Sequence, residues 1–202
     1  MKEYPNLKKY ILVSLALALV LTFSSCSLSK DTLKKGTSEA KISAIISEHI
    51  KDVVISEKKL PNGNTLQVFS ASNDEAASLF GLDVLKNAPE IKEVQIEVHD
   101  GSVVFTGIVT KLPSYIKSTD FRSKKKALKD INKILRKMGI SRSGQCGVSY
   151  SDKNNKDTYI YDVQSISEDD RPVLSVSLGA PLKDTVYIEP SGTGGYIPGV
   201  IE

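Results

Sequence analysis

The feature that most constrains the fold is a recurring order of elements, in which an apolar stripe with helical spacing precedes two short extended runs. In the first example, Ile42, Ile45 and Ile46 recur every three or four positions, which is the period of an amphipathic helix. Extended runs follow at residues 53–57 and 65–70, separated by a short turn segment. The pattern predicts a helix, a strand and a second strand.

The same order occurs twice more along the chain. The predicted units cover residues 38–70, 72–109 and 123–164, and a terminal hairpin covers residues 173–189. Helices that alternate with short hairpins favour the α+β class, and connections of this length are too short for parallel crossovers. We therefore expect repeated αββ units that form an antiparallel or mixed sheet, with amphipathic helices packed on one face.

Local residue chemistry supports the first two units. Asn62-Gly63 and Asp100-Gly101 each stand between extended runs, and both dipeptides favour tight hairpin turns. The sequence Ile-Lys-Asp-Val-Val-Ile at residues 50–55 resembles Ile-Lys-Glu-Val-Gln-Ile at residues 91–96. Similarity at a period of about forty residues favours a duplicated unit. Chance recurrence of a short motif is the alternative.

Two further signals mark where helices begin and end. Ser72 and Glu75 have the spacing of a capping box, which predicts a helix that begins after Ser72. Gly139 follows a helical stripe in the third unit, and glycine is the residue most often found just beyond a helix C-terminus. We expect the third helix to run from residue 123 to residue 138.

The N-terminus has the layout of an export signal. Lys2, Lys8 and Lys9 precede an apolar run of about thirteen residues at positions 11–23. A charged segment followed by such a run is typical of a signal peptide, and a transmembrane helix needs roughly twenty apolar residues. A cleaved signal at residues 1–25 is the leading interpretation.

The end of this run, Phe-Ser-Ser-Cys at residues 23–26, resembles the lipobox of bacterial lipoproteins. Phe23 departs from the usual leucine. The resemblance implies cleavage before Cys26 and attachment of lipid to its thiol, on the extracytoplasmic side of a bacterial membrane. Several acyl chains would make that attachment effectively permanent. An uncleaved signal anchor and ordinary secretion with a free Cys26 are the alternatives.

Loss of residues 1–25 would remove three lysines and one glutamate, so the formal net charge of +3 would fall to +1. A nearly neutral chain gives no support to a nucleic-acid partner. Residues 26–37 are polar and are predicted to form a lipidated tether, whereas residues 190–202 are rich in glycine and proline and are predicted to form a flexible tail. The α+β domain is expected to cover residues 38–189.

Residues 73–150 have the predicted order αββαβ, and residues 89–107 resemble the BON domain. In that family a valine-rich strand, a turn with glycine and a second strand ending in glycine follow a helix, and Gly101 and Gly107 match the two glycines. The link at residues 111–122 is longer than the family pattern. The resemblance implies a non-enzymatic envelope module that binds phospholipid or another envelope component, and it implies no catalytic residue.

No pattern of catalytic, metal or cofactor-binding residues is found. With Cys26 acylated, Cys146 is the one remaining thiol and has no disulfide partner. A nucleophilic cysteine needs a neighbouring base, and the chain has only His49 and His99. We expect a strand cysteine, a core-edge His49 and a solvent-facing His99. The loop carboxylates lack calcium-loop spacing; they are Asp152, Asp157, Asp169 and Asp170.

The strongest charge feature is the polar side of the third predicted helix. Its cations are Arg122, Lys124, Lys125, Lys126, Lys129, Lys133, Arg136 and Lys137. Such a face either contacts an anionic membrane or polymer or keeps the helix soluble. The leading hypothesis is a lipid-anchored, non-enzymatic binding or structural protein of the envelope. The alternative is an exported enzyme or effector that uses Cys146 or the loop carboxylates.

Overall fold

The structure is a computed structural model of the chain. It describes residues 30–116, 123–140, 143–149, 160–166, 172–179 and 182–190, with side chains described except at residues 143–149, 166, 172 and 173. The described residues from Asp31 onward belong to one compact unit. Cys26, Arg122, the four loop aspartates and residues 191–202 lie outside the described residues.

The described residues form three α-helices, one 3-10 helix and eight β-strands. In chain order these are α2 (Glu39–His49), β1 (Ser56–Lys59), β2 (Thr65–Phe69), α3 (Asn73–Phe80), η1 (Asp83–Asn87), β3 (Ile91–His99), β4 (Ser102–Lys111), α4 (Lys124–Lys137), β5 (Ser143–Ser149), β6 (Ile160–Ile166), β7 (Pro172–Gly179) and β8 (Thr185–Glu189). The predicted α+β class is confirmed.

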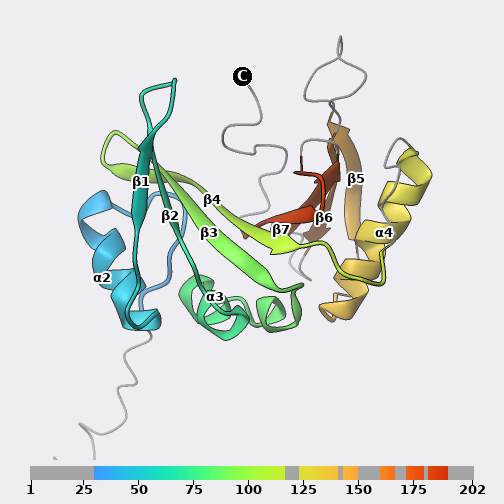
Figure 1. The fold of residues 1–202 in the computed structure, drawn as a ribbon, viewed down its shortest axis with the longest axis horizontal. Helices are drawn as coiled ribbons and strands as arrows, with labels where there is room; N and C mark the ends of the chain where they lie inside the picture. The colour runs from blue at the N-terminus through green and yellow to red at the C-terminus, as the bar shows by residue number, and fades with distance from the viewer. Residues whose placement is uncertain are drawn as a thin grey trace, which may run out of the picture. The chain divides into compact units, whose positions relative to one another are not determined.

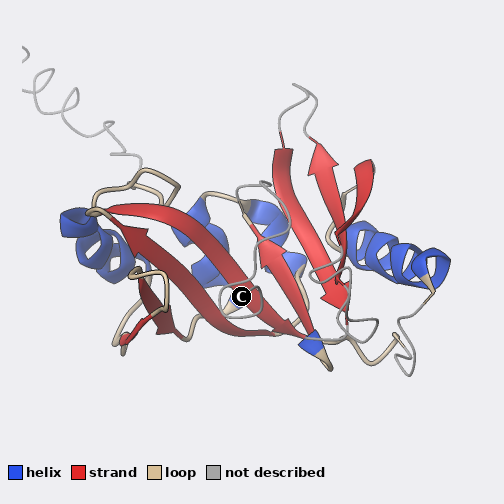
Figure 2. Cartoon of the chain, turned by 90° about the horizontal axis from the view of Figure 1, so that it is seen from above, coloured by secondary structure: helices blue, strands red, loops and turns tan. Residues whose placement is uncertain are grey.

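The eight strands form one sheet in the order β1-β2-β3-β4-β8-β7-β6-β5 (Figure 1). All pairings of the described strands are antiparallel. Two four-stranded meanders meet where β8 pairs with β4, in a register that sets Ile108 opposite Ile188 and Thr110 opposite Val186. Helix α4 connects the two meanders in sequence, and it packs against β6 and β7 (Figure 2).

The local signals of the sequence are confirmed at several points. Ser72 and Glu75 make the reciprocal hydrogen bonds of a capping box at the start of α3. Gly63 has φ of 85°, and the turn between β3 and β4 places Asp100 at 46° and Gly101 at 70°. Positive φ is readily adopted by glycine and is tolerated by aspartate in tight turns. Both turns join two strands as predicted, although the first strand of the first hairpin begins at Ser56 and not at residue 53.

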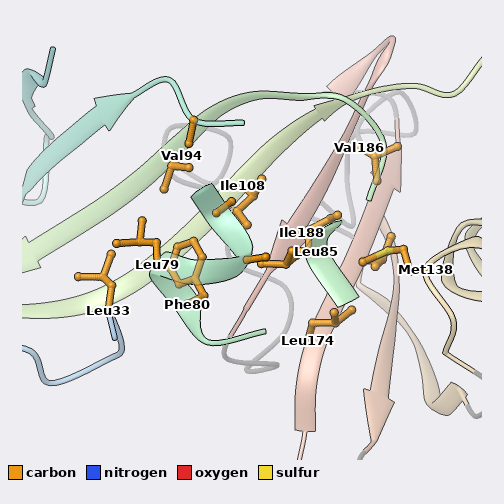
Figure 3. Close-up of a cluster of buried hydrophobic side chains, with 14 of the residues drawn as sticks. Leu33, Leu79, Phe80, Leu85, Val94, Ile108, Met138, Leu174, Val186 and Ile188 are labelled. Atoms are coloured by element: carbon orange, nitrogen blue, oxygen red, sulfur yellow. The ribbon is translucent and has the colours of Figure 1, made fainter. Parts of the chain in front are cut away.

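One large cluster of buried apolar side chains joins the helices to the sheet. It contains Ile42 and Ile46 from α2 and Ile131 from α4, each 1% exposed or less. Figure 3 shows how the cluster continues along the sheet, from Leu33 through Ile108 to the second meander. The two meanders thus share one apolar core.

The predicted tether, residues 26–37, is too long at its C-terminal end. Leu33 is 2% exposed, and its N–H donates to the carbonyl of Leu79 at 2.8 Å. Gly36 and Thr37 exchange backbone hydrogen bonds with Val103 at the start of β4, at 2.7 and 2.8 Å. The buried side chain of Leu33 and these backbone hydrogen bonds hold the segment on the domain, so any free tether ends before Leu33.

His49 holds the same segment from the end of α2. Its Nε2 lies 2.7 Å from the carbonyl oxygen of Asp31, and its Nδ1 lies 2.7 Å from the hydroxyl oxygen of Ser78. A carbonyl can only accept a hydrogen bond, so Nε2–H donates, and in the neutral ring Nδ1 accepts from the Ser78 hydroxyl. His49 therefore has a structural role at the edge of the core, as expected.

A second, smaller cluster contains Phe105, Ile160, Leu182 and Tyr187. The rings of Phe105 and Tyr187 are stacked, with centroids 6.0 Å apart and planes at 2°. The Tyr187 side chain lies directly over Gly107, where an added Cβ would overlap it. The BON resemblance places Gly107 at a strand end, but it lies within β4, which continues to Lys111.

Candidate functional site

Helix α4 is oriented by its buried side. The hydroxyl of its N-cap residue, Ser123, accepts a hydrogen bond from the N–H of Lys126 at 3.4 Å. Ala127, Ile131 and Ile134 are fully buried, and the helix packs on strands β5, β6 and β7. This packing fixes which side of the helix faces outward.

The opposite side of α4 is basic. Successive helix residues turn by about 100°, so Lys125, Lys129, Lys133 and Arg136 project from the side opposite Ile131. Six of the helix cations are exposed and Lys126 is half-buried; the exposed ones are Lys124, Lys125, Lys129, Lys133, Arg136 and Lys137. Lys124, in the first turn, lies on the same angular side as Ile131 but is exposed. We call all seven cations of the helix the α4 basic face. Arg122, the eighth predicted cation, lies outside the described residues.

The cations of the α4 basic face form no ion pair with a carboxylate that the structure describes. The only acidic residue in the helix sequence is Asp130, which is half-buried. Among the described residues, no cation of the face makes a salt bridge, whereas Lys86, His99 and Lys111 each have a carboxylate partner elsewhere. A solvated helix usually mixes charges of both signs, so this face has an unusual excess of positive charge.

Lys133 contacts the segment between β4 and α4. Its ammonium nitrogen donates to the carbonyl of Tyr115 at 3.1 Å and lies 5.2 Å from the centroid of the Tyr115 ring, within the range of a cation–π contact. Tyr115 is 38% exposed, and its partial burial raises the pKa of the phenol above its ordinary value. The adjacent Ile116 is 4% exposed and anchors this segment in the core.

A pocket of about 470 Å³ opens beside Tyr115. Three parts of the chain line it: the connection from η1 to β3, the end of β4 with the residues after it, and Lys137 at the end of α4. On its wall, the ammonium of Lys111 lies 3.5 Å from a carboxylate oxygen of Glu90, and both side chains are more than half exposed. We call this the Tyr115 pocket.

Of the pocket residues, Lys137 was predicted from the sequence, whereas the others, including Glu90, Lys111 and Tyr115, were not. These residues come from two connections that are separated by the whole β3–β4 hairpin. The one available signal was the long link after Lys111, interrupted by Pro113. Long connections often carry function in compact domains, but the sequence gives no means of pairing this link with the η1–β3 connection.

The other predicted positions that the structure describes are not among the described lining residues of the pocket. Cys146 lies in β5 opposite Val163, and its side chain is outside the described part. His99 is exposed and pairs with Asp100 at 3.1 Å. In the described part of the chain, no group of three or more His, Cys, Asp or Glu side chains is arranged to hold a metal ion. None of the described helices is long and apolar enough to span a bilayer.

No protein-family model, no curated protein and no solved structure matches this chain. The lipobox and BON resemblances therefore stay predictions from the sequence.

Proposed function

We propose that the chain is a bacterial lipoprotein, anchored through lipid on Cys26, that acts as a non-enzymatic binding or structural module of the cell envelope. In this proposal the α4 basic face makes a second, weaker contact with the anionic surface of a bilayer. The observation that carries the proposal is the charge of this face, which has seven cations on one helix and no salt bridge to a described carboxylate.

The expected strength of this contact follows from the number of cations that reach the surface. Each lysine or arginine near an anionic leaflet contributes about 1 kcal/mol. Lys125, Lys129, Lys133 and Arg136 project from the outward side of α4, which gives roughly 4 kcal/mol, or a dissociation constant on the order of 1 mM. The contact is therefore reversible and depends on the lipid anchor to keep the domain at the membrane.

The proposal includes a finer view of the architecture. The order α2-β1-β2, α3-β3-β4 and α4-β5-β6 fits three αββ units at residues 38–70, 72–109 and 123–164. The helices contribute their buried side chains to a single apolar cluster, which supports a layer of helices on one face of the sheet. This leaves the outward side of α4 for contact with a surface.

Co-sedimentation with vesicles tests the membrane contact. The protein is residues 27–202, which contain the whole compact unit. A Lys125→Gln, Lys129→Gln, Arg136→Gln variant should lose about 3 kcal/mol of binding to vesicles rich in phosphatidylglycerol, or on the order of 100-fold. The matched control changes three exposed lysines elsewhere, Lys41, Lys51 and Lys92, to glutamine.

The expected result is a large loss for the α4 variant, a small loss for the control, and weakening of wild-type binding by salt. Equal losses in the two variants would overturn the assignment to α4. Binding to polyphosphate without binding to vesicles would overturn the bilayer contact and would indicate that the α4 basic face binds an anionic polymer.

The lipid anchor needs its own experiment. Cells grown with a clickable fatty acid should label the full chain but not a Cys26→Ala variant. An unlabelled wild type, in cells that label other lipoproteins, would overturn the anchor.

A further inference from the structure

The Tyr115 pocket has the size and the preformed walls of a small-molecule site. Its volume of about 470 Å³ lies within the usual range for ligand pockets, roughly 300–1,000 Å³. Pro89 lies in the η1–β3 connection and Pro113 lies after β4, and both residues line the pocket. The fixed φ of proline limits the freedom of the backbone at both positions. The N–H of Leu112 donates to the carbonyl of Asp184 at 2.7 Å, which ties one wall to the segment before β8.

The charges in the pocket favour an anionic ligand. Lys111 and Lys137 are exposed cations on its wall, and Glu90 is the acidic residue among the described lining residues. Lys133 adds a third ammonium beside Tyr115. The C-terminal end of α4 carries a partial charge of about −0.5, which these cations outweigh.

The uncharged residues indicate that the ligand is not a bare anion. Tyr115 lines the pocket and is 38% exposed, and the ammonium of Lys133 lies over its aromatic ring. Asn87 and Ser114 add neutral donors and acceptors. The Glu90 carboxylate can only accept hydrogen bonds, so it would repel a phosphate or carboxylate but would accept bonds from hydroxyl groups.

We propose that the Tyr115 pocket binds an anionic saccharide, meaning a sugar ring that carries a phosphate or a carboxylate. The ring packs its C–H face against Tyr115 and Pro113, and its hydroxyl groups bond to Glu90, Asn87 and Ser114. The acidic group is held by Lys111 and Lys137. This site shares Lys133 and Lys137 with the α4 basic face. The vesicle test changes Lys125, Lys129 and Arg136, which are not among the described lining residues of the pocket. Either proposal can therefore fail without the other.

Binding of four soluble probes to residues 27–202 tests this proposal, measured by calorimetry and by chemical-shift changes of backbone amides. The probes are glucose 6-phosphate, glucuronic acid, glucose and glycerol 3-phosphate. The two anionic sugars should bind at least about tenfold more tightly than glucose, since a charge-assisted hydrogen bond to lysine is worth about that factor. Glycerol 3-phosphate lacks the ring and should bind as weakly as glucose.

Variants locate the site. Lys111→Gln and Tyr115→Ala should each weaken binding of the anionic sugars about tenfold, while the exposed Lys41→Gln control should not. Lys111→Gln is a surface change that leaves the core intact, so it remains informative if Tyr115→Ala disturbs the loop. Neither variant should alter vesicle binding by the α4 basic face.

Three results would overturn the proposal. Equal binding of glycerol 3-phosphate and glucose 6-phosphate would show that the phosphate alone is recognised. Binding that is unchanged in Lys111→Gln would place the ligand elsewhere. Absence of binding by either anionic sugar at millimolar concentration would exclude a saccharide site.

Discussion

Replacement of Gly107 by alanine is the sharpest test of the packing between the two meanders. Gly107 lies in β4 opposite Gln95, and the ring of Tyr187 from β8 covers it. A Cβ added at Gly107 would overlap Oη and Cζ of Tyr187 and would lie 2.9 Å from Cε2. Tyr187 is 2% exposed and stacks on Phe105, so it has little room to move aside.

Two opposing effects set the size of the change. Overpacking of a well-filled site costs about 1–3 kcal/mol. Alanine in a strand is otherwise favoured over glycine by roughly 0.5–1 kcal/mol, because it loses less conformational freedom on folding. Gly107→Ala should therefore lower the free energy of unfolding by about 1–2 kcal/mol, and the melting temperature by roughly 2–8 °C for a domain of this size.

Urea and thermal unfolding of residues 27–202 measure this effect, and a double-mutant cycle assigns its cause. Tyr187→Leu keeps an apolar side chain but removes the hydroxyl oxygen and the two ring carbons that the Cβ of an alanine at Gly107 would meet. In that background Gly107→Ala should be neutral or slightly stabilising. An equal loss of stability in both backgrounds would refute the steric explanation, since the penalty would then arise without the tyrosine ring.

Three further predictions concern stability, each measured by urea unfolding. Leu33→Ala should lower the free energy of unfolding by about 2–5 kcal/mol because Leu33 is a core residue. The control Lys35→Ala should change it by less than about 0.5 kcal/mol, and an equally small effect of both variants would mean that the segment around Leu33 is not packed on the domain. Ser72→Ala removes the capping box of α3 and should lower the free energy of unfolding by about 0.5–2 kcal/mol. Amide hydrogen exchange should become faster in α3 than in the other elements. Glu97 is 1% exposed and accepts hydrogen bonds from side-chain amides of the β1–β2 turn. Glu97→Ala should therefore lower the free energy of unfolding by about 1–3 kcal/mol, and Glu97→Gln, which keeps an acceptor oxygen, by clearly less. Equal losses would show that the acceptor oxygen is unimportant.

The elements that short-range chemistry specifies were predictable from sequence. The helix of the third unit was expected at residues 123–138 and is observed at Lys124–Lys137, because its apolar stripe, its N-cap serine and Gly139 all agree. The capping box at Ser72 and the turn at Asp100-Gly101 were also identified, because hydrogen bonds and φ angles within four residues determine them. The basic side of α4 followed from the same helical periodicity.

Features that depend on distant partners were not predictable. The first strand was expected at residues 53–57 but is observed at Ser56–Lys59, because an exposed edge strand rich in lysine lacks the apolar alternation used to locate strands. Nothing local indicates that β8 pairs with β4 or that the N–H of Leu33 donates to the carbonyl of Leu79. The Tyr115 pocket was missed for the same reason, since it forms only when the β3–β4 hairpin brings its two connections together.

The docking of Leu33 also changes how the proposed anchor and the α4 basic face would work together. Cys26 precedes Leu33 by seven residues, which can span at most about 25 Å when fully extended. A tether this short makes contact of the domain with the membrane effectively intramolecular, with an effective concentration in the millimolar range. A contact with a dissociation constant on the order of 1 mM is then substantially populated, although it is weak for the free domain. In this proposal, neutralising the α4 basic face changes how often the domain lies on the membrane surface but leaves the protein in the membrane fraction, whereas only loss of Cys26 releases it.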